Sequence, residues 1–340
     1  MTTTTLGRPP SKGWAIVARK EFADHLLSVR FIVLLIVLGL VAAAAVYTTA
    51  NEVRNVAGDA SETPFLFLLL FTVNIEPVPM SFFLAVAFLA PLLGIAFGFD
   101  SINGERSRGT LPRLVSQPIY RDDVINGKFA AGLAIISVIL FAVTAVVGGI
   151  GIFRLGITPS AEEVLRLLLW LIVTMIYVGI WLAFATFSSV ALRRAATAAL
   201  LTIAVWLVLA PVDDVIGDPN AAGTGLFWGF VTEVVADTLA PVDESSATLE
   251  EVVSNAETQQ AVDRLSPVRL YEDASLALLN PEVRSVGVVT ITQLDRAVIS
   301  ELAVVQSLLL VWSQVVGMVA ATVVIFAVSY VVFMRQEIRA

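Results

Sequence analysis

Residues 129–153 read F-A-A-G-L-A-I-I-S-V-I-L-F-A-V-T-A-V-V-G-G-I-G-I-F, without a single charged side chain. A helix of this length measures about 37 Å and therefore crosses a hydrocarbon core of about 30 Å. Of the 340 residues, 57% are hydrophobic and 15% are charged, whereas soluble proteins average about 45–50% and about 25%. The sequence therefore predicts an all-α integral membrane protein.

Further apolar blocks lie at residues 31–49, 82–99, 165–188, 195–211 and 308–334. Together with 129–153 they predict six transmembrane helices, of which 195–211 is the shortest. The apolar run at 65–73 is too short to span, so we expect it to be an interfacial or re-entrant piece.

The basic residues predict the orientation of these helices. The two termini and the even-numbered loops together hold 14 Lys and Arg residues, and the odd-numbered loops hold seven. Because cytoplasmic loops carry the basic excess, we expect a multi-pass plasma-membrane protein with both termini in the cytoplasm. The chain then divides into an N-terminal segment (1–30), the first five helices and their loops (31–212), an outward loop (213–307), and the last helix with its tail (308–340).

The outward loop is strongly acidic. Residues 213–301 hold 16 carboxylates against four arginines. Carboxylates stay hydrated in concentrated salt, where screening removes their mutual repulsion. A large acidic extracellular loop is therefore typical of a protein exposed to concentrated salt, and we expect the source to be a halophilic archaeon. An ordinary acidic loop in a bacterium with a GC-rich genome is the alternative.

The residue types that the chain lacks exclude several functions. There is no cysteine and only one histidine, His25, which excludes thiolate sites, His-rich metal clusters and a Ser-His-Asp triad. The net charge of -8 argues against nucleic acid as a partner. No pair of carboxylates lies inside the predicted spans, so we expect no intramembrane protease and no enzyme activity in this chain.

An amphipathic helix is predicted before the first span, between Trp14 and Arg30. Its apolar side chains recur at spacings of three and four, at Trp14, Ala18, Phe22, Leu26 and Val29. Such a helix lies in the membrane interface, and His25 is expected to be an interfacial residue. The alternative interpretation is that the basic residues of this segment only set the orientation of the first span.

The loop at 100–128 carries the most informative pattern, D-S-I-N-G-E-R-S-R-G-T-L-P-R-L-V-S-Q-P-I-Y-R-D-D-V-I-N-G-K. Leu111, Leu114 and Val115 lie at helical spacing before Pro118, and Asp122 and Asp123 suit the first turn of another helix. We therefore expect two short helices parallel to the membrane, on a surface that docks a cytoplasmic partner.

This run resembles the pattern E-R-x-x-G-T-L-x-x-L-x-x-x-P-x-x-R-x-x-x-x-x-G-K of the permease subunits of type 2 ATP-binding-cassette (ABC-2) transporters. The matching residues are Glu105, Arg106, Gly109, Thr110, Leu111, Leu114, Pro118, Arg121, Gly127 and Lys128. The resemblance implies a coupling helix here that contacts a cytoplasmic ATPase subunit, beside the N-terminal amphipathic helix. It also implies a second permease copy or homologue. We expect Glu105 and Arg106 to lie on an exposed loop and to dock the ATPase.

Residues 265–281, L-S-P-V-R-L-Y-E-D-A-S-L-A-L-L-N-P, resemble the outward loop before the last span in archaeal members of this family. The chain contains no G-x-x-x-x-G-K-[ST] loop, because Phe129 follows Lys128 and no other Gly-Lys pair exists. We therefore expect no cofactor in this chain, with ATP and Mg²⁺ bound by the partner subunit.

The polar residues inside the predicted spans are few, and Thr174, Tyr177, Ser313 and Gln314 are the candidates for a translocation path. Interhelical hydrogen bonding is their alternative role. Their scarcity argues against a proton-coupled secondary transporter and favours export of a lipid-like molecule. An ion-coupled secondary transporter and a copper-maturation permease remain the alternative functions, with Met175 and Met318 as the soft ligands inside the spans.

Overall fold

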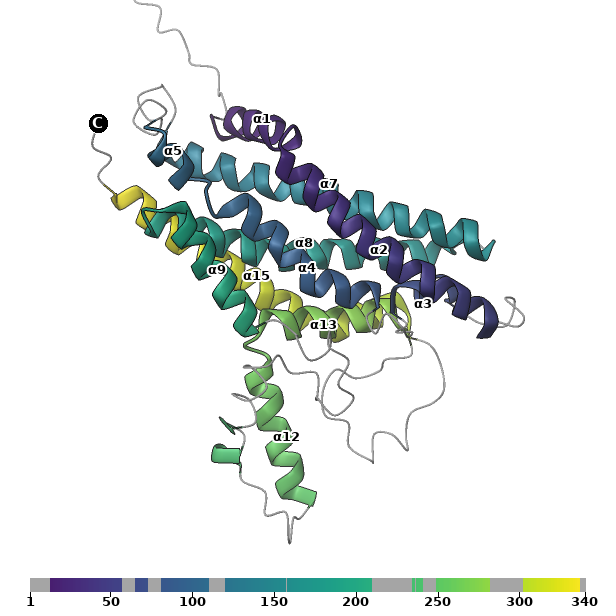
Figure 1. The fold of residues 1–340 in the computed structure, drawn as a ribbon. Helices are drawn as coiled ribbons and strands as arrows, with labels where there is room; N and C mark the ends of the chain where they lie inside the picture. The colour runs from purple at the N-terminus through teal and green to yellow at the C-terminus, as the bar shows by residue number, and fades with distance from the viewer. Residues whose placement is uncertain are drawn as a thin grey trace, which may run out of the picture.

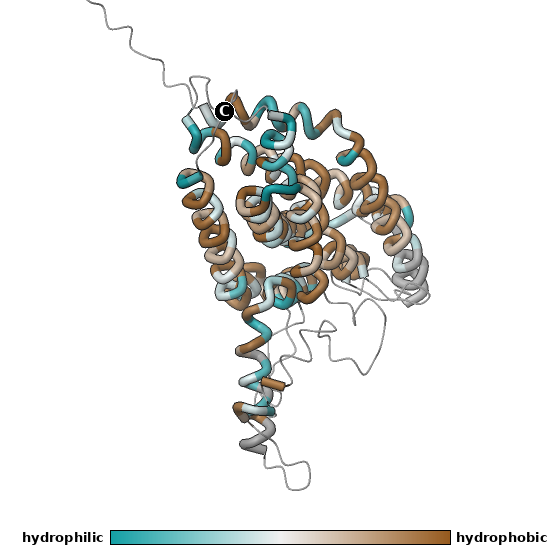
Figure 2. The backbone as a smooth tube through the Cα atoms, turned by 60° about the vertical axis from the view of Figure 1, so that its left-hand side comes forward, coloured by the Kyte–Doolittle hydropathy of each residue, from teal (hydrophilic) through white to brown (hydrophobic). Residues whose placement is uncertain are grey.

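The computed structural model describes residues 13–56, 65–72, 81–109, 120–156, 158–209, 234–235, 237–240, 249–281 and 302–336. Within these ranges the secondary structure is helical, and the long helices lie side by side in a bundle (Figure 1). Hydrophobic residues dominate the middle of the bundle, and hydrophilic residues gather toward its ends (Figure 2).

Among the described residues, five helical segments are long and apolar enough to cross a membrane. They are α2 (Val29–Val56), α4 (Phe82–Gly98) together with the adjoining α5 (Asn103–Ser107), α7 (Arg121–Leu155), α8 (Ala161–Ala191) and α15 (Val304–Arg335). The sixth predicted span begins as α9 (Ala195–Leu209), whose 15 residues measure about 22 Å. The chain is thus a multi-pass, all-helical membrane protein.

The helices run in alternating directions between two ends of the bundle. The described chain begins with α1 (Gly13–Leu26) and stops after α15 at the end that carries α5, which we call the α5 end (Figure 1). The opposite end, called the α13 end, carries α3 (Leu66–Thr72) and α13 (Pro267–Leu279). Helix α12 (Leu249–Asp263) extends beyond the α13 end.

Helix α8 lies at the centre of the bundle, with α4, α7, α9, α13 and α15 packed on it. It begins with a capping box, in which Ser160 accepts a hydrogen bond from the Glu163 amide and Glu163 accepts one from the Ser160 amide. Gly94 and Gly98 of α4 face the α8 backbone so closely that a Cβ at Gly94 would lie 2.7 Å from the Leu182 nitrogen. Small residues therefore allow α4 to approach α8, as in other membrane helix pairs.

Helices α2 and α15 leave broad apolar surfaces uncovered. Exposed side chains include Leu40 at 66%, Leu309 at 73% and Trp312 at 68%. An apolar surface of this kind is stable against lipid or against another membrane helix.

One sequence expectation is wrong in detail. Asp122 and Asp123 do not begin a separate short helix, because they lie in the first turn of α7, which continues without a break to Leu155. A single glycine such as Gly127 costs about 1 kcal/mol in a helix but does not end it. The run at 65–73 forms α3, whose seven residues are too few to span, and its Leu70 and Phe71 are fully buried among the long helices.

Candidate functional site

The α5 end holds the residues of the predicted coupling loop. Helix α5 has no side-chain cap of its own. The Ser189 hydroxyl, near the last turn of α8, accepts hydrogen bonds from the backbone amides of Ile102 (3.0 Å) and Asn103 (3.1 Å). Because the first amides of a helix lack partners within that helix, Ser189 fixes the start of α5 on the end of α8.

Lys128 lies between two carboxylates from different helices. Its Nζ is 3.0 Å from Glu21 Oε1 on α1 and 3.5 Å from Glu105 Oε1 on α5. The three side chains are 5%, 11% and 12% exposed respectively. The expectation that Glu105 lies on an exposed loop is therefore wrong, because the folded chain encloses it beside Lys128.

This ion-pair cluster borders a polar cavity of about 310 Å³, which Asp100 and Arg30 also line. The Arg30 guanidinium lies 2.7 Å from Asp100 Oδ2, which ties the start of α2 to the end of α4. His25 also lines the cavity, and burial lowers its pKa, with Glu21 opposing that shift.

Helix α1 forms inside the predicted range but ends at Leu26, because Val29 and Arg30 already belong to α2. It is fixed to α7 by close backbone packing. A Cβ at Gly127 would lie 2.7 Å from the Trp14 carbonyl oxygen and 2.6 Å from the Val17 Cβ. Asp123 Oδ1 accepts a hydrogen bond from the Trp14 amide (2.9 Å), which caps α1 from outside. Val17 and Glu21 form the buried side of α1, whereas Trp14 is 41% exposed on the predicted apolar face.

The two arginines of the pattern contact the end of the last helix. Arg106 Nη2 donates to Gln336 Oε1 (2.6 Å), and Arg121 Nη1 donates to the Gln336 carbonyl oxygen (3.1 Å). Gly109 has φ of +67°, a conformation that glycine adopts without strain, and it follows the end of α5. Thr110, Leu111, Leu114 and Pro118 lie outside the described residues.

Two of the candidate path residues, Thr174 and Tyr177, contact Tyr271 of α13. Tyr271 of α13 stacks on Tyr177 with ring centroids 4.3 Å apart, and its hydroxyl lies 3.0 Å from Thr174 Oγ1. Tyr177 donates to the Ala87 carbonyl oxygen (2.8 Å). The Ser313 hydroxyl donates to Gln314 Oε1 (2.8 Å).

A fully buried arginine holds the α13 end together. Arg166 of α8 donates to the carbonyl oxygens of Leu278 (3.3 Å) and Leu302 and to Ser307 Oγ (3.1 Å). It also pairs with Glu162 at 2.9 Å. The neighbouring Glu163 accepts a hydrogen bond from the Phe67 amide (3.0 Å) at the start of α3. The first turns of α8 therefore fix α3, α13 and the start of α15.

The model of one protein family, described as ABC-2 family transporter protein, matches residues 15–338. The chain belongs to the ABC-2 family of transporter proteins. Membership indicates a membrane permease subunit of an ABC transporter.

A curated relative of this permease is the probable ABC transporter permease protein NosY of Stutzerimonas stutzeri. The two sequences are 31% identical over 135 residues. That stretch is 38% of this chain and 47% of the relative, so the permease matches about half the length of that protein.

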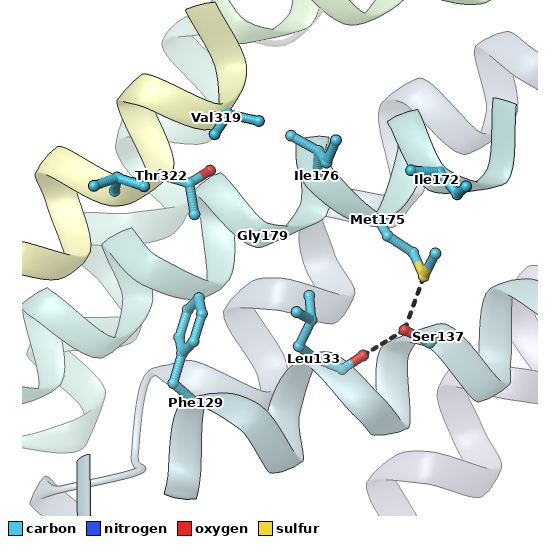
Figure 3. A pocket seen from close by; sticks show the side chains of 10 residues that line it. Phe129, Leu133, Ser137, Ile172, Met175, Ile176, Gly179, Val319 and Thr322 are labelled. Atoms are coloured by element: carbon cyan, nitrogen blue, oxygen red, sulfur yellow. Dashed lines mark hydrogen bonds between the residues drawn. The ribbon is translucent and has the colours of Figure 1, made fainter. Parts of the chain in front are cut away.

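The permease has an apolar cavity of about 320 Å³ between α7, α8 and α15 (Figure 3). Phe129, Met175 and Val319 are among its lining residues. Its two hydroxyl groups have partners within the chain. Ser137 Oγ lies 2.7 Å from the Leu133 carbonyl oxygen and 2.9 Å from Met175 Sδ. Thr322 Oγ1 donates to the Met318 carbonyl oxygen (2.9 Å). This cavity therefore suits an apolar group.

Sequence reasoning missed Glu21, Ser189 and Gln336 at the α5 end and Arg166 and Tyr271 at the α13 end. The position of Arg166 in an apolar stretch was a usable signal, because a charge inside a membrane helix is costly without partners. Ser189 and Gln336 carry no comparable signal, since a serine near a helix end and a glutamine after one are common.

Proposed function

We propose that this chain is a six-helix permease subunit in the plasma membrane, with α9 as part of the fifth span. Its α5 end and both termini face the cytoplasm. Two ATPase subunits, which bind ATP and Mg²⁺, dock at the α5 ends of two permease copies and power export across the membrane.

The observation that carries this proposal is the attachment of α5. This short helix matches the family pattern, is capped by α8 through Ser189, and is paired with α7 through Lys128. A force applied to α5 therefore reaches the spanning helices directly. Glu105 is enclosed, whereas Ser107 and Arg108 are exposed and form the surface that a partner meets.

Charge supports the orientation. The α5 end carries basic residues on α1, on α5 and at Arg193 and Arg194 after α8. The segment that contains α12 and α13 belongs to the acidic stretch at 213–301. This distribution matches the positive-inside rule and an acidic exterior adapted to concentrated salt.

The apolar cavity supports a lipid-like cargo. It lies between three helices long enough to span, and its hydroxyl groups already have partners. An acyl chain needs no polar partner and gains free energy by leaving water.

The proposal is tested with single cysteines, because the chain has none of its own. Ser107→Cys, carrying a photo-crosslinker, should capture a subunit with a G-x-x-x-x-G-K-[ST] loop and should react with an impermeant thiol reagent only after the membrane is opened. Leu265→Cys, 72% exposed at the α13 end, should give the opposite results. The reverse labelling pattern would refute the orientation.

A charge reversal separates docking from folding. Arg108→Glu should reduce co-purification of the ATPase subunit, whereas Arg194→Glu, also exposed at the α5 end, serves as the matched control. Equal co-purification of the two variants would refute docking at α5.

A further inference from the structure

One residue, Gln336, joins four helices at the α5 end. It follows the last residue of α15, and its Oε1 accepts a hydrogen bond from Arg106 of α5 (2.6 Å). Its Nε2 donates to the Val190 carbonyl oxygen of α8 (2.8 Å), and its carbonyl oxygen accepts from Arg121 of α7 (3.1 Å).

An amide side chain suits this position because it offers one acceptor and one donor group. Val190 belongs to the last turn of α8, where carbonyl groups lack partners within the helix. The guanidinium of Arg106 supplies only donors. Glutamine therefore satisfies both neighbours, whereas leucine would satisfy neither and glutamate only the arginine.

A small apolar cluster, separate from the main core, accompanies Gln336. It contains Ile102 beside α5, Ile125 of α7, Val190 of α8 and Phe333 of α15, all fully buried. These residues come from the same four elements that Gln336 links. The α5 end thus has its own small core and its own polar connection, which allows it to move as one block.

The contact between α5 and the end of α8 also contains buried polar groups without hydrogen-bond partners among the described residues. Among the described residues, the fully buried Asn103 side chain at the start of α5 has no hydrogen-bond partner, and neither has the Ser188 hydroxyl of α8. Leaving buried polar groups unpaired is costly. If a displacement of α5 gave these groups hydrogen-bond partners, the displaced state would avoid that free-energy cost.

We propose that Gln336 is a positioning residue that makes the last helix, α15, follow α5 when the ATPase moves it. This inference rests on the proposed function. Without the Gln336 amide, α5 would keep its connections to α1, α7 and α8 through Lys128 and Ser189. It would lose its hydrogen bond to the end of α15 and keep only the apolar packing of Ile102 with Phe333.

The test uses the full chain in complex with its ATPase subunit and two spin labels on exposed positions, Leu40→Cys on α2 and Val324→Cys on α15. A non-hydrolysable ATP analogue with Mg²⁺ should change the distance between the labels in the parent. In Gln336→Leu the population of the shifted state relative to the resting state should fall roughly tenfold, which corresponds to about one charge-assisted hydrogen bond. Co-purification of the ATPase should be unchanged.

Gln306→Leu is the matched control, because Gln306 lies on the same helix at the α13 end and contacts only the Ala303 amide among the bonds described. It should respond as the parent does. Gln336→Glu, which keeps an acceptor for Arg106 and loses the donor to Val190, should give an intermediate response and decides the question if the leucine variant fails to fold.

The outcomes separate this inference from the proposed function. If nucleotide shifts the parent and both Gln336 variants shift to the same extent as the parent, the role of Gln336 is refuted and the proposed function stands. If Gln336→Leu loses the ATPase subunit, Gln336 acts in docking and the inference is refuted. If the parent itself does not respond to nucleotide, the proposed function and this inference fail together.

Discussion

The two ends of α8 hold their neighbours by different chemistry. At the α13 end, Arg166 donates to two backbone carbonyl oxygens, a serine hydroxyl and Glu162. At the α5 end, Ser189 accepts from two backbone amides, and Lys128 pairs with carboxylates from two other helices.

The difference predicts which end moves. A guanidinium has five donors in a rigid fork, and backbone carbonyl groups of packed helices have fixed positions, so the Arg166 site has one arrangement. An ammonium is a compact charge on a flexible stem that can exchange partners. We therefore expect a rigid α13 end and, at the α5 end, a Lys128 site that can exchange its partners.

The largest expected effect comes from Arg166→Leu. This change leaves buried carbonyl oxygens of α13 and of the segment before α15 without a donor, so the free energy of unfolding should fall by about 3–5 kcal/mol. Thermal unfolding in detergent measures it. Arg264→Leu, at an exposed arginine just before α13, should change stability by less than about 0.5 kcal/mol. Equal effects of the two variants would contradict the rigid α13 end.

A smaller loss is expected from Lys128→Met, about 2–3 kcal/mol, because Glu21 and Glu105 lose their cation while some water still reaches them. Changing all three charges together, Lys128→Met with Glu21→Gln and Glu105→Gln, should recover most of this loss. Chemical unfolding of the single, double and triple variants provides the cycle. A triple variant as unstable as Lys128→Met would show that packing and not charge decides this site.

The smallest effect concerns pH at the α13 end. Burial raises the pKa of Asp273 from 3.8 to about 6, with Asp263 adding to the shift and Arg269, Arg264 and Gln314 opposing it. The folded state therefore binds this proton more tightly than the unfolded state, so stability should fall as the pH rises from about 4 to about 6 and stay level above.

Amide hydrogen exchange of α13 at pH 5 and pH 7, corrected for intrinsic exchange rates, measures this dependence. Protection should be higher at pH 5 in the parent and equal at both values in Asp273→Asn. Glu257→Gln on α12, at an exposed carboxylate, is the control that should keep the parent's dependence. A dependence that survives Asp273→Asn would assign it to another group.

Much of the fold follows from the sequence. The apolar blocks predicted the places of α2, α4, α7, α8, α9 and α15, because hydrophobic length is a local property. Helices α2 and α7 continue beyond their apolar blocks into polar sequence, which that property does not show. The family pattern also identified Glu105, Arg106, Arg121 and Lys128 as candidate site residues from the sequence alone. It did not reveal that these residues contact one another's helices and leave Ser107 and Arg108 exposed.

By itself, the sequence determined the membrane class, the places of the long apolar helices and the family, since each depends on residues near one another in the chain. Only the tertiary structure decided which polar groups meet. Lys128 and Glu21, Ser189 and Asn103, Arg166 and Leu302, and Gln336 and Arg106 are paired across long stretches of chain. Hydrogen bonds and ion pairs depend on positions within a few ångströms, and helix packing sets those positions.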